Sequence, residues 1–266
     1  MALNYEKLMG LKRSGDRFGY TDLHTMLYAV GIGMSRDPYD PNELAYTYEA
    51  SKLKTVPTLA SVLTRVPLLK DCGYDYTKVV HGEQRLTLFR PLEPEGELIA
   101  DSRVVEAYDK GPGKGAVIYS ETAARSAKDG KPVFTNVSTT FARGDGGFGG
   151  PNGSGPEPHK LPDRKPDLSV PLETRTDQAL LYRLSGDRNP LHADPELAKR
   201  VGFPVPILHG LCTYGTTCRA ILQSVCKYDH TQITGLDVAF RRPSIPAKRS
   251  SRTSGSTAKR FRSVRA

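Results

Sequence analysis

Residues 207–226 read ILHGLCTYGTTCRAILQSVC, and residues 235–240 read GLDVAF. The first run is long, mostly apolar and free of proline, so it predicts a buried helix over Ile207–Cys226. The second predicts the start of a strand over Gly235–Phe240. Upstream, four runs that tend to alternate apolar and polar residues predict antiparallel strands: Val79–Phe89, Glu97–Tyr108, Ala116–Thr122 and Val133–Phe141. A long apolar helix together with antiparallel strands favours an α+β fold in which a curved sheet wraps a helix.

The chain divides into two halves around a Gly/Pro-rich linker, residues 144–171. Its proline and glycine content excludes a helix or a central strand. Its glycines lack the GxGxxG spacing and no helix follows them, which argues against a nucleotide-binding loop. We therefore expect one unit over residues 1–143 and another over residues 172–243. Two further short helices are expected over Asp22–Val30 and Thr176–Leu184.

Composition excludes several classes of protein. With 266 residues the chain can bury a sizeable core, and no run approaches the roughly 18 apolar residues of a membrane span. The first residues lack the pattern of a signal peptide, so we expect a cytoplasmic protein in a reducing compartment. The four cysteines form no CxxC pair and are expected to be buried thiols, which leaves no metal site: Cys72, Cys212, Cys218 and Cys226.

The net charge of +9 is confined to the end of the chain. Residues 241–266 contain nine basic and no acidic side chains, so residues 1–240 carry no net charge. A nucleic-acid-binding protein usually carries its basic patch on the folded surface. Within the basic tail, residues 244–266, Phe261 is the sole aromatic residue, whereas binding of single strands needs several. The charge pattern therefore argues against nucleic-acid binding.

Residues 182–192, YRLSGDRNPLH, contain the densest group of chemically active side chains. Gly186 and Pro190 end the preceding helix, so Asp187, Asn189 and His192 are expected on one tight loop. A carboxylate, an amide and an imidazole can converge on a single water, accept or deliver its proton and fix its orientation. The spacing alone equally allows the carboxylate to be a helix cap and the histidine to be an ordinary, partly buried side chain.

Residues 206–211, PILHGL, stand where the long apolar helix is expected to begin. Backbone N–H groups near Gly210 would therefore be unpaired and would carry the positive end of the helix dipole. Such a position can stabilise an oxyanion on a carbonyl group. Alternatively, this glycine serves close packing between helix and sheet.

Taken together, these two segments resemble the hydratase signature of MaoC-like R-specific enoyl-CoA hydratases, and in particular the hydratase domain of peroxisomal multifunctional enzymes of type two. Other segments fit the same pattern: His81-Gly82-Glu83-Gln84, Pro91-Leu92, Asp109-Lys110-Gly111 and the glycine run at 146–150. The resemblance spans roughly residues 15–243. It implies a double hot-dog fold, in which the first unit accommodates the acyl chain and the second contains the active site.

Carried over to this chain, the resemblance implies that Asp187 and His192 are the catalytic pair and that Asn189 organises them. The Gly210 N–H would donate to the thioester oxygen. Further residues would contact the acyl-CoA: His81, Gly82, Lys110, Arg188, Pro190, Leu191 and Phe240. For two of these a structural explanation remains open, because Asp109-Lys110-Gly111 also suits a hairpin turn and His81 also suits a strand edge.

The implied reaction, a hydro-lyase step of fatty-acid β-oxidation, reversibly adds water to a trans-2-enoyl-CoA to give a (3R)-3-hydroxyacyl-CoA. It needs no metal or redox cofactor, and the only implied partner is the acyl-CoA substrate, although a homodimer is compatible with the family. A eukaryotic source would make the peroxisome an alternative location. Two rival functions are a hot-dog acyl-CoA thioesterase and a non-catalytic, degenerate acyl-CoA-binding protein.

The basic tail departs from the family pattern, because 15 of its 23 residues are Ser, Thr, Lys or Arg. We therefore expect the second unit to be incomplete at its C-terminus. With suitable codon choices, back-translation of the tail in the frame that starts one nucleotide earlier yields VYPGETIVEDIWIDGETVSFRA, which resembles the strands the family would have there. We hypothesise a frameshift after Pro243, and predict low solubility or activity for the polypeptide as written, since an unpaired sheet edge would remain exposed.

Overall fold

The computed structural model describes residues 3–50, 52–70, 72–75, 78–153, 155–156, 163, 165, 167–240 and 245–246. Apart from Ile245 and Pro246, the basic tail lies outside the described residues, and so does the hypothesis of a frameshift there. The described strands form one antiparallel sheet in the order β1-β3-β4-β5-β2-β6. Their bounds are β1 Lys12–Tyr20, β2 Val79–Leu88, β3 Gly96–Asp109, β4 Ala116–Ser126, β5 Pro132–Ala142 and β6 Gly235–Ala239.

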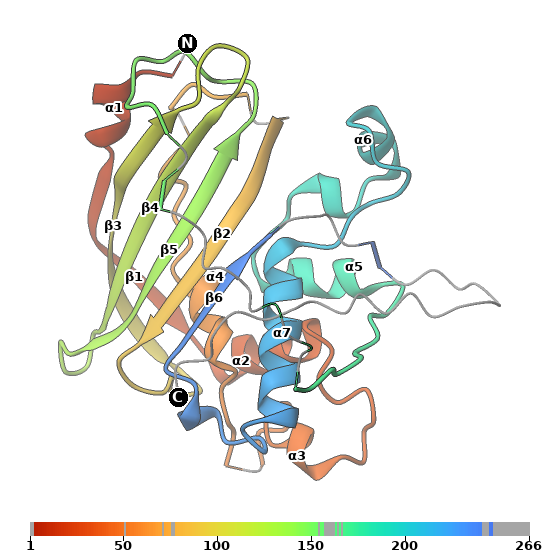
Figure 1. The fold of residues 1–266 in the computed structure, drawn as a ribbon. Helices are drawn as coiled ribbons and strands as arrows, with labels where there is room; N and C mark the ends of the chain where they lie inside the picture. Colours follow the sequence, from red (N-terminus) through yellow and green to blue (C-terminus); the bar gives the residue numbers. More distant parts are fainter. Residues whose placement is uncertain are drawn as a thin grey trace.

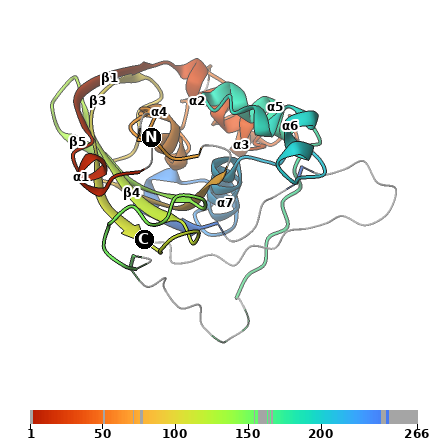
Figure 2. The same ribbon diagram turned by 90° about the horizontal axis from the view of Figure 1, so that it is seen from above.

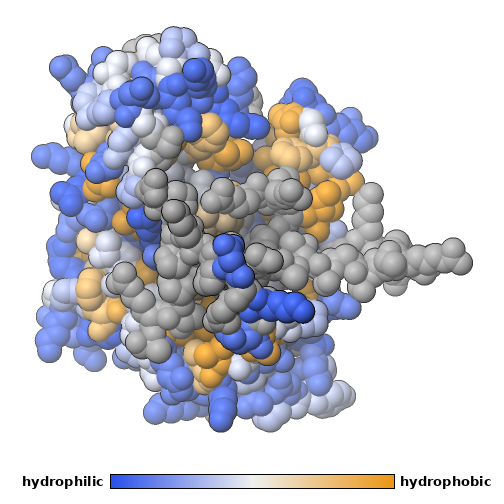
Figure 3. All heavy atoms as spheres, viewed as in Figure 1, coloured by the Kyte–Doolittle hydropathy of each residue, from blue (hydrophilic) through white to orange (hydrophobic). Residues whose placement is uncertain are grey.

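The sheet curves around the helices, most of which lie on its concave side (Figures 1 and 2). The α-helices are α1 Tyr5–Met9, α2 Asp22–Gly31, α3 Pro41–Leu44, α4 Ala60–Leu63, α5 Gln178–Tyr182, α6 Pro195–Arg200 and α7 Gly210–Ser224. Short 3₁₀ turns connect them: η1 Pro57–Leu59, η3 Arg183–Ser185, η4 Pro190–His192 and η5 His230–Gln232. In the space-filling view, hydrophilic residues predominate at the upper end of the sheet, and hydrophobic residues gather near α6 (Figure 3).

One hydrophobic core joins the two halves of the chain. It contains Tyr28 and Ile32 at α2, Tyr214 and Leu222 of α7, and Leu86 of the sheet. The two helices pack closely because α7 has a glycine at position 215: a Cβ there would lie 2.4 Å from the Ile32 Cγ2 and 2.8 Å from the Tyr28 hydroxyl. Since β6 pairs with β2, the second half also extends the sheet of the first. The halves therefore fold around shared apolar surface.

A buried ion pair connects α3 to α7 inside this packing. The Arg219 Nε lies 2.7 Å from Glu43 Oε1, and its Nη2 lies 3.1 Å from Oε2, a bidentate arrangement. The Glu43 carboxylate also accepts the Ser35 N–H at 2.7 Å. The two side chains are only 10% and 3% exposed. Because both charges are removed from water, losing either partner would leave the other uncompensated.

Most elements expected from sequence are present. The four strands of the first half, the helix at 22–30 and the strand at 235–240 are confirmed to within a few residues, and all four cysteines are buried and free. The long helix begins at Gly210 rather than Ile207, and the helix expected over Thr176–Leu184 is the shorter α5 followed by η3. Strand β1 was not predicted, because its sequence KRSGDRFGY is charged, contains two glycines and is mostly solvent-exposed at the sheet edge.

The linker matches its prediction where it can be seen. Its described residues contain no helix and no strand beyond an isolated bridge at Asn152. Within the described part of the chain, no helix combines the length and apolar character needed to cross a membrane.

Candidate active site

Three turns in succession shape the loop that carries the predicted catalytic pair. Gly186 ends η3 with a φ of +113°, a left-handed conformation that glycine adopts without steric cost. The Asn189 side chain accepts the Leu191 N–H at 3.0 Å and so caps η4, and the Asn189 N–H donates to the Asp187 carboxylate at 3.3 Å. These local bonds hold Asp187 and His192 on one compact loop. Asn189 is exposed and acts through these two hydrogen bonds.

Asp187 and His192 come together, and a second histidine joins them. The carboxylate and the two imidazoles of His192 and His209 each present an atom, and these atoms all lie within 4.8 Å of one another. The two rings are stacked, with centroids 3.7 Å apart and planes inclined by 28°. A water that makes hydrogen bonds of about 2.8 Å to two groups can bridge atoms separated by this distance. The arrangement thus suits a single water held between the carboxylate and an imidazole.

The hydrogen bonds assign the tautomers of the stacked histidines. The His192 Nδ1 lies 2.8 Å from the Ile207 carbonyl oxygen, and the His209 Nε2 lies 3.0 Å from the Asp187 carbonyl oxygen. A carbonyl oxygen only accepts, so each of these nitrogens carries the proton. Burial lowers the pKa of His192, and burial together with the neighbouring His192 lowers the pKa of His209 to about 4. Both rings are therefore neutral at pH 7, and the His192 Nε2 has a free lone pair.

Asp187 forms an ion pair with a residue of the first unit. The Arg65 Nη1 lies 2.8 Å from Asp187 Oδ2, and the side chains are 46% and 19% exposed, respectively. Burial raises the pKa of the carboxyl group, but the Arg65 charge and the Asn189 N–H outweigh it and bring the pKa below its usual value. Asp187 is consequently ionised at neutral pH.

The start of α7 faces the end of β6. As the first residue of α7, Gly210 has an N–H without an acceptor inside the helix. The Phe240 ring covers its α-carbon, since a Cβ on Gly210 would lie 3.5 Å from the ring. The same ring lies 4.8 Å from the His81 imidazole, centroid to centroid. The Phe240 ring therefore brings Gly210 and His81 close together, and contact of these residues with substrate stays a prediction.

A bulge in β2 positions His81 there. The register against β5 shifts between His81 and Glu83, and the carbonyl of the intervening Gly82 accepts the Phe240 N–H at 2.8 Å. The His81 Nε2 is 2.9 Å from the Glu83 carbonyl oxygen, so this nitrogen also carries its proton. Burial lowers the His81 pKa to about 4. Bulges that re-aim a side chain are frequent beside active sites.

The other predicted contact residues are more scattered. Arg188 and Pro190 are exposed and Leu191 is half-buried on the catalytic loop. Lys110 lies in the β3–β4 hairpin, with its ammonium group 5.7 Å from the centre of the Phe141 ring. The segment Asp109-Lys110-Gly111 does lie in a hairpin turn. There the Asp109 carboxylate accepts N–H bonds from Gly111, Gly147 and Gly149. A contact between Lys110 and substrate stays a prediction.

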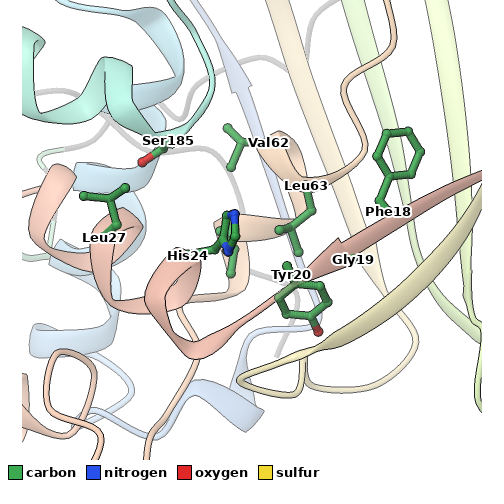
Figure 4. A pocket seen from close by; sticks show the side chains of 9 residues that line it. Phe18, Gly19, Tyr20, His24, Leu27, Val62, Leu63 and Ser185 are labelled. Atoms are coloured by element: carbon green, nitrogen blue, oxygen red, sulfur yellow. The ribbon is translucent and has the colours of Figure 1, made fainter.

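A partly open cavity of about 150 Å³ lies next to the loop of Asp187 and His192 (Figure 4). Ser185, two residues before Asp187, forms part of its wall, and Leu63, two residues before Arg65, forms another part. The remaining lining comes from β1, α2, η1 and α4: Phe18, Gly19, Tyr20, His24, Leu27, Leu59 and Val62. Its lining combines apolar side chains with the polar groups of His24 and Ser185, and its volume is about that of a benzene-sized group.

The three clustered groups are also of the types that bind metal ions. Their ligand atoms lie within 4.8 Å of one another, a spacing that allows either a zinc ion bound at about 2.0–2.1 Å or a single bridging water. One nitrogen of each histidine donates to a backbone carbonyl, as metal-binding histidines also do, whereas the Arg65 cation already compensates the carboxylate charge. That the reaction needs no metal or other cofactor stays a prediction.

Sequence reasoning missed two members of this site. His209 stands inside the quoted PILHGL motif, and its place one residue before a helix start was a usable signal. Arg65 lies in an irregular apolar segment that carries no motif, so its contact with Asp187 arises purely from the tertiary fold.

Comparisons with known proteins identify the family. Residues 18–144 match the MFE-2 hydratase 2 N-terminal domain, and residues 158–253 match the MaoC-like domain. The enoyl-CoA hydratase ChsH3 of Mycobacterium tuberculosis is 40% identical over 256 residues, covering 93% of this chain and 87% of that protein. The chain belongs to the MaoC-like hydratase family.

Solved structures of the MaoC-like family establish the fold. A MaoC-like dehydratase from Phytophthora capsici superimposes with a TM-score of 0.79 at 32% identity, covering 92% of this chain and 85% of that one. A Mycobacterium tuberculosis protein described as a double hotdog fold aligns with a TM-score of 0.51 at 11% identity, over 92% of this chain and 83% of that one, a likeness of fold alone. The predicted α+β hot-dog architecture is confirmed.

Proposed function

We propose that this MaoC-like protein reversibly hydrates trans-2-enoyl-CoA to (3R)-3-hydroxyacyl-CoA. The observation that carries the proposal is the approach of the Asp187 carboxylate and the His192 imidazole to within 4.8 Å, beside the start of α7. These groups supply what hydration of an enoyl thioester requires: a held water, a base for its proton and a positive partner for the charge that forms on the thioester oxygen.

In the proposed reaction, the water lies between the Asp187 carboxylate and the unprotonated His192 Nε2. Its oxygen bonds to carbon 3 of the enoyl group while Nε2 takes one of its protons. The electrons of the double bond move toward the thioester, and His192 then returns a proton to carbon 2. Asp187 stays ionised throughout and stabilises the transient imidazolium, as its lowered pKa favours. The steps use only side chains, backbone and substrate, without a cofactor.

The enolate charge would be held at the N-terminus of α7. The Gly210 N–H is the proposed donor to the thioester oxygen, aided by the positive end of the helix dipole. A preorganised donor of this kind contributes about 2.7–4 kcal/mol to transition-state stability. We further propose that His81, Gly82 and Phe240 border the thioester, since they surround Gly210.

The acyl chain would extend into the first unit, residues 1–143. The cavity of about 150 Å³ between β1, α2 and α4 is the proposed place for this chain, because Ser185, two residues before Asp187, forms part of its wall. Its volume favours short acyl chains of about six carbons, the size of the benzene that a cavity this large holds. Residues 172–243 would form the second unit and supply the catalytic groups.

A hydration assay tests the proposal. Crotonyl-CoA and hexenoyl-CoA are added, loss of the enoyl absorbance is followed, and free thiol is measured in parallel. We expect absorbance to fall without release of thiol, and a (3R)-specific but not a (3S)-specific dehydrogenase to oxidise the product. Thiol release would favour the thioesterase alternative, and binding of crotonyl-CoA without any turnover would favour the non-catalytic alternative.

Three expectations remain proposals of the same kind. We propose the cytoplasm as the location, because the four free, buried cysteines suit a reducing compartment. A homodimer is proposed as compatible with the family, and light scattering tests it. The frameshift after Pro243 is tested by resequencing the coding DNA, where an intact frame through codon 266 would refute a sequencing error.

A further inference from the structure

We propose that Arg65 is a positioning residue for the hydration reaction, which holds the Asp187 carboxylate in place and lets the first unit control the catalytic loop of the second. The inference rests on the proposed function. Arg65 follows α4, whereas Asp187 belongs to the loop between η3 and η4, so 122 positions of chain separate the partners. No local turn of the catalytic loop could supply this contact.

The geometry secures the two carboxylate oxygens separately. The Arg65 Nη1 contacts Oδ2 at 2.8 Å, and the Asn189 N–H donates to Oδ1 at 3.3 Å. The guanidinium bond is the shorter and is charge-assisted, so it is the stronger anchor. The Asp187 side chain is only 19% exposed. Without Arg65, one weak backbone bond from the described residues, that of the Asn189 N–H, would be left to orient the carboxylate toward the water shared with His192.

The Arg65 guanidinium also affects the charge states of Asp187 and His192. Among the described residues, the titratable groups coupled to Asp187 come from five places: Arg65 after α4, Tyr182 on α5, His192 on η4, His209 before α7 and His81 on β2. The guanidinium lowers the pKa of Asp187 against the effect of burial, and it adds to the effect of burial in lowering the pKa of His192. The mechanism needs Asp187 ionised and His192 neutral, and Arg65 favours both states.

A second use of Arg65 makes the opposite prediction. Its side chain is 46% exposed, so it could instead contact a phosphate of coenzyme A. A phosphate contact acts on binding, which raises KM, whereas a positioning residue acts on the chemical step, which lowers kcat. An enoyl N-acetylcysteamine thioester has the reacting group but no phosphate, and therefore separates the two roles.

The experiment compares Arg65→Met and Arg65→Lys with the wild type, using crotonyl-CoA and crotonyl N-acetylcysteamine. Arg17→Met is the matched control, because Arg17 also forms an exposed ion pair, with Glu97 at 2.6 Å. For Arg65→Met we expect kcat to fall about 10- to 100-fold with both substrates, the scale of a misplaced catalytic group. The acid limb of its pH profile should move to higher pH, and Arg65→Lys should restore part of both properties. Arg17→Met should change neither.

Several outcomes overturn the inference and leave the proposed function intact. These are a rise in KM at constant kcat, a loss seen with crotonyl-CoA but absent with the N-acetylcysteamine thioester, or a lower kcat whose acid limb has not moved. Thermal denaturation verifies that each variant is folded, and Arg65→Lys retains the charge should Arg65→Met be unstable. If the wild type hydrates neither substrate, the proposed function itself fails, which is seen before any variant is measured.

Discussion

Replacing Gly210 with proline removes one backbone N–H from the first position of α7 while the helix is expected to remain. Proline is favoured at the first position of a helix, where its missing N–H has no intrahelical acceptor. The preceding residue, His209, has φ −56° and ψ 137°, which is the extended conformation required before proline. A Cβ at position 210 lies 3.5 Å from the Phe240 ring, an ordinary van der Waals contact. The substitution therefore isolates the proposed oxyanion donor.

The expected loss follows from the single hydrogen bond removed. Loss of one such donor lowers kcat by about 10²- to 10³-fold, or about 2.7–4 kcal/mol. Gly210→Ala is the matched control, because it adds the same Cβ and keeps the N–H. Both substitutions reduce the freedom of the unfolded chain, which stabilises by about 0.4–1 kcal/mol where the backbone conformation is compatible. Neither variant should therefore melt below the wild type.

The assay is saturating hydration of crotonyl-CoA, with Tm measured on the same samples. Saturation matters because the proline ring takes the space of the lost hydrogen and will also raise KM. If Gly210→Pro is folded and its kcat stays within threefold of that of Gly210→Ala, the N–H of residue 210 does not stabilise the transition state. The role proposed for the start of α7 would then be wrong.

The remaining predictions address the catalytic pair, the core, pH and the acyl cavity. Asp187→Asn and His192→Ala should each lower kcat by about 10²- to 10⁴-fold; a fall below tenfold, with Tm near that of the wild type, contradicts their roles. Arg219→Met should lower the free energy of unfolding by about 3–5 kcal/mol, since it leaves a buried glutamate unpaired; urea titration checks this, and a loss under 1 kcal/mol refutes it. The pKa of His209, about 4, lies below its unfolded value of about 6.5. Because the unfolded chain then binds a proton more readily than the folded one, the stability linked to neutral His209 is complete above pH 6.5 and is lost as pH falls toward 4. As pH falls from about 6.5 to about 4, Tm should decline less in His209→Gln than in the wild type, and equal declines in the two proteins would refute this role of His209. Val62→Phe should fill the cavity and lower kcat/KM about 10- to 200-fold for hexenoyl-CoA relative to crotonyl-CoA, whereas an unchanged ratio would place the acyl chain elsewhere.

Patterns within single segments predicted the elements of this fold well. The alternation in the runs around β2 to β5 and the apolar character of α7 are local properties, and each is set by which face of an element is buried. The edge strand β1 was not predicted because most of its residues are exposed, so its sequence does not alternate between apolar and polar side chains. The start of α7 was misplaced by three residues, since the apolar run continues beyond the helix into Ile207 and Leu208.

The compact loop of Asp187 and His192 was likewise predictable, because Gly186, Pro190 and the polar residues between them are adjacent in the chain. Local turns account for the placing of Asp187 relative to Asn189 and Leu191. Motif resemblance added Gly210, which lies on a different element.

The rest of the site depends on contacts between distant segments. Arg65 meets Asp187, and Phe240 meets both His81 and Gly210, because α7, β2 and β6 share one core. Hydrophobic burial is non-directional. The apolar pattern of an element therefore predicts that one of its faces is buried, but it does not predict which other element packs against that face. Local order along the chain thus indicated the elements and the reactive loop. The environment of the Asp187 carboxylate, and with it the charge of Asp187 and His192, arises from packing across the two halves.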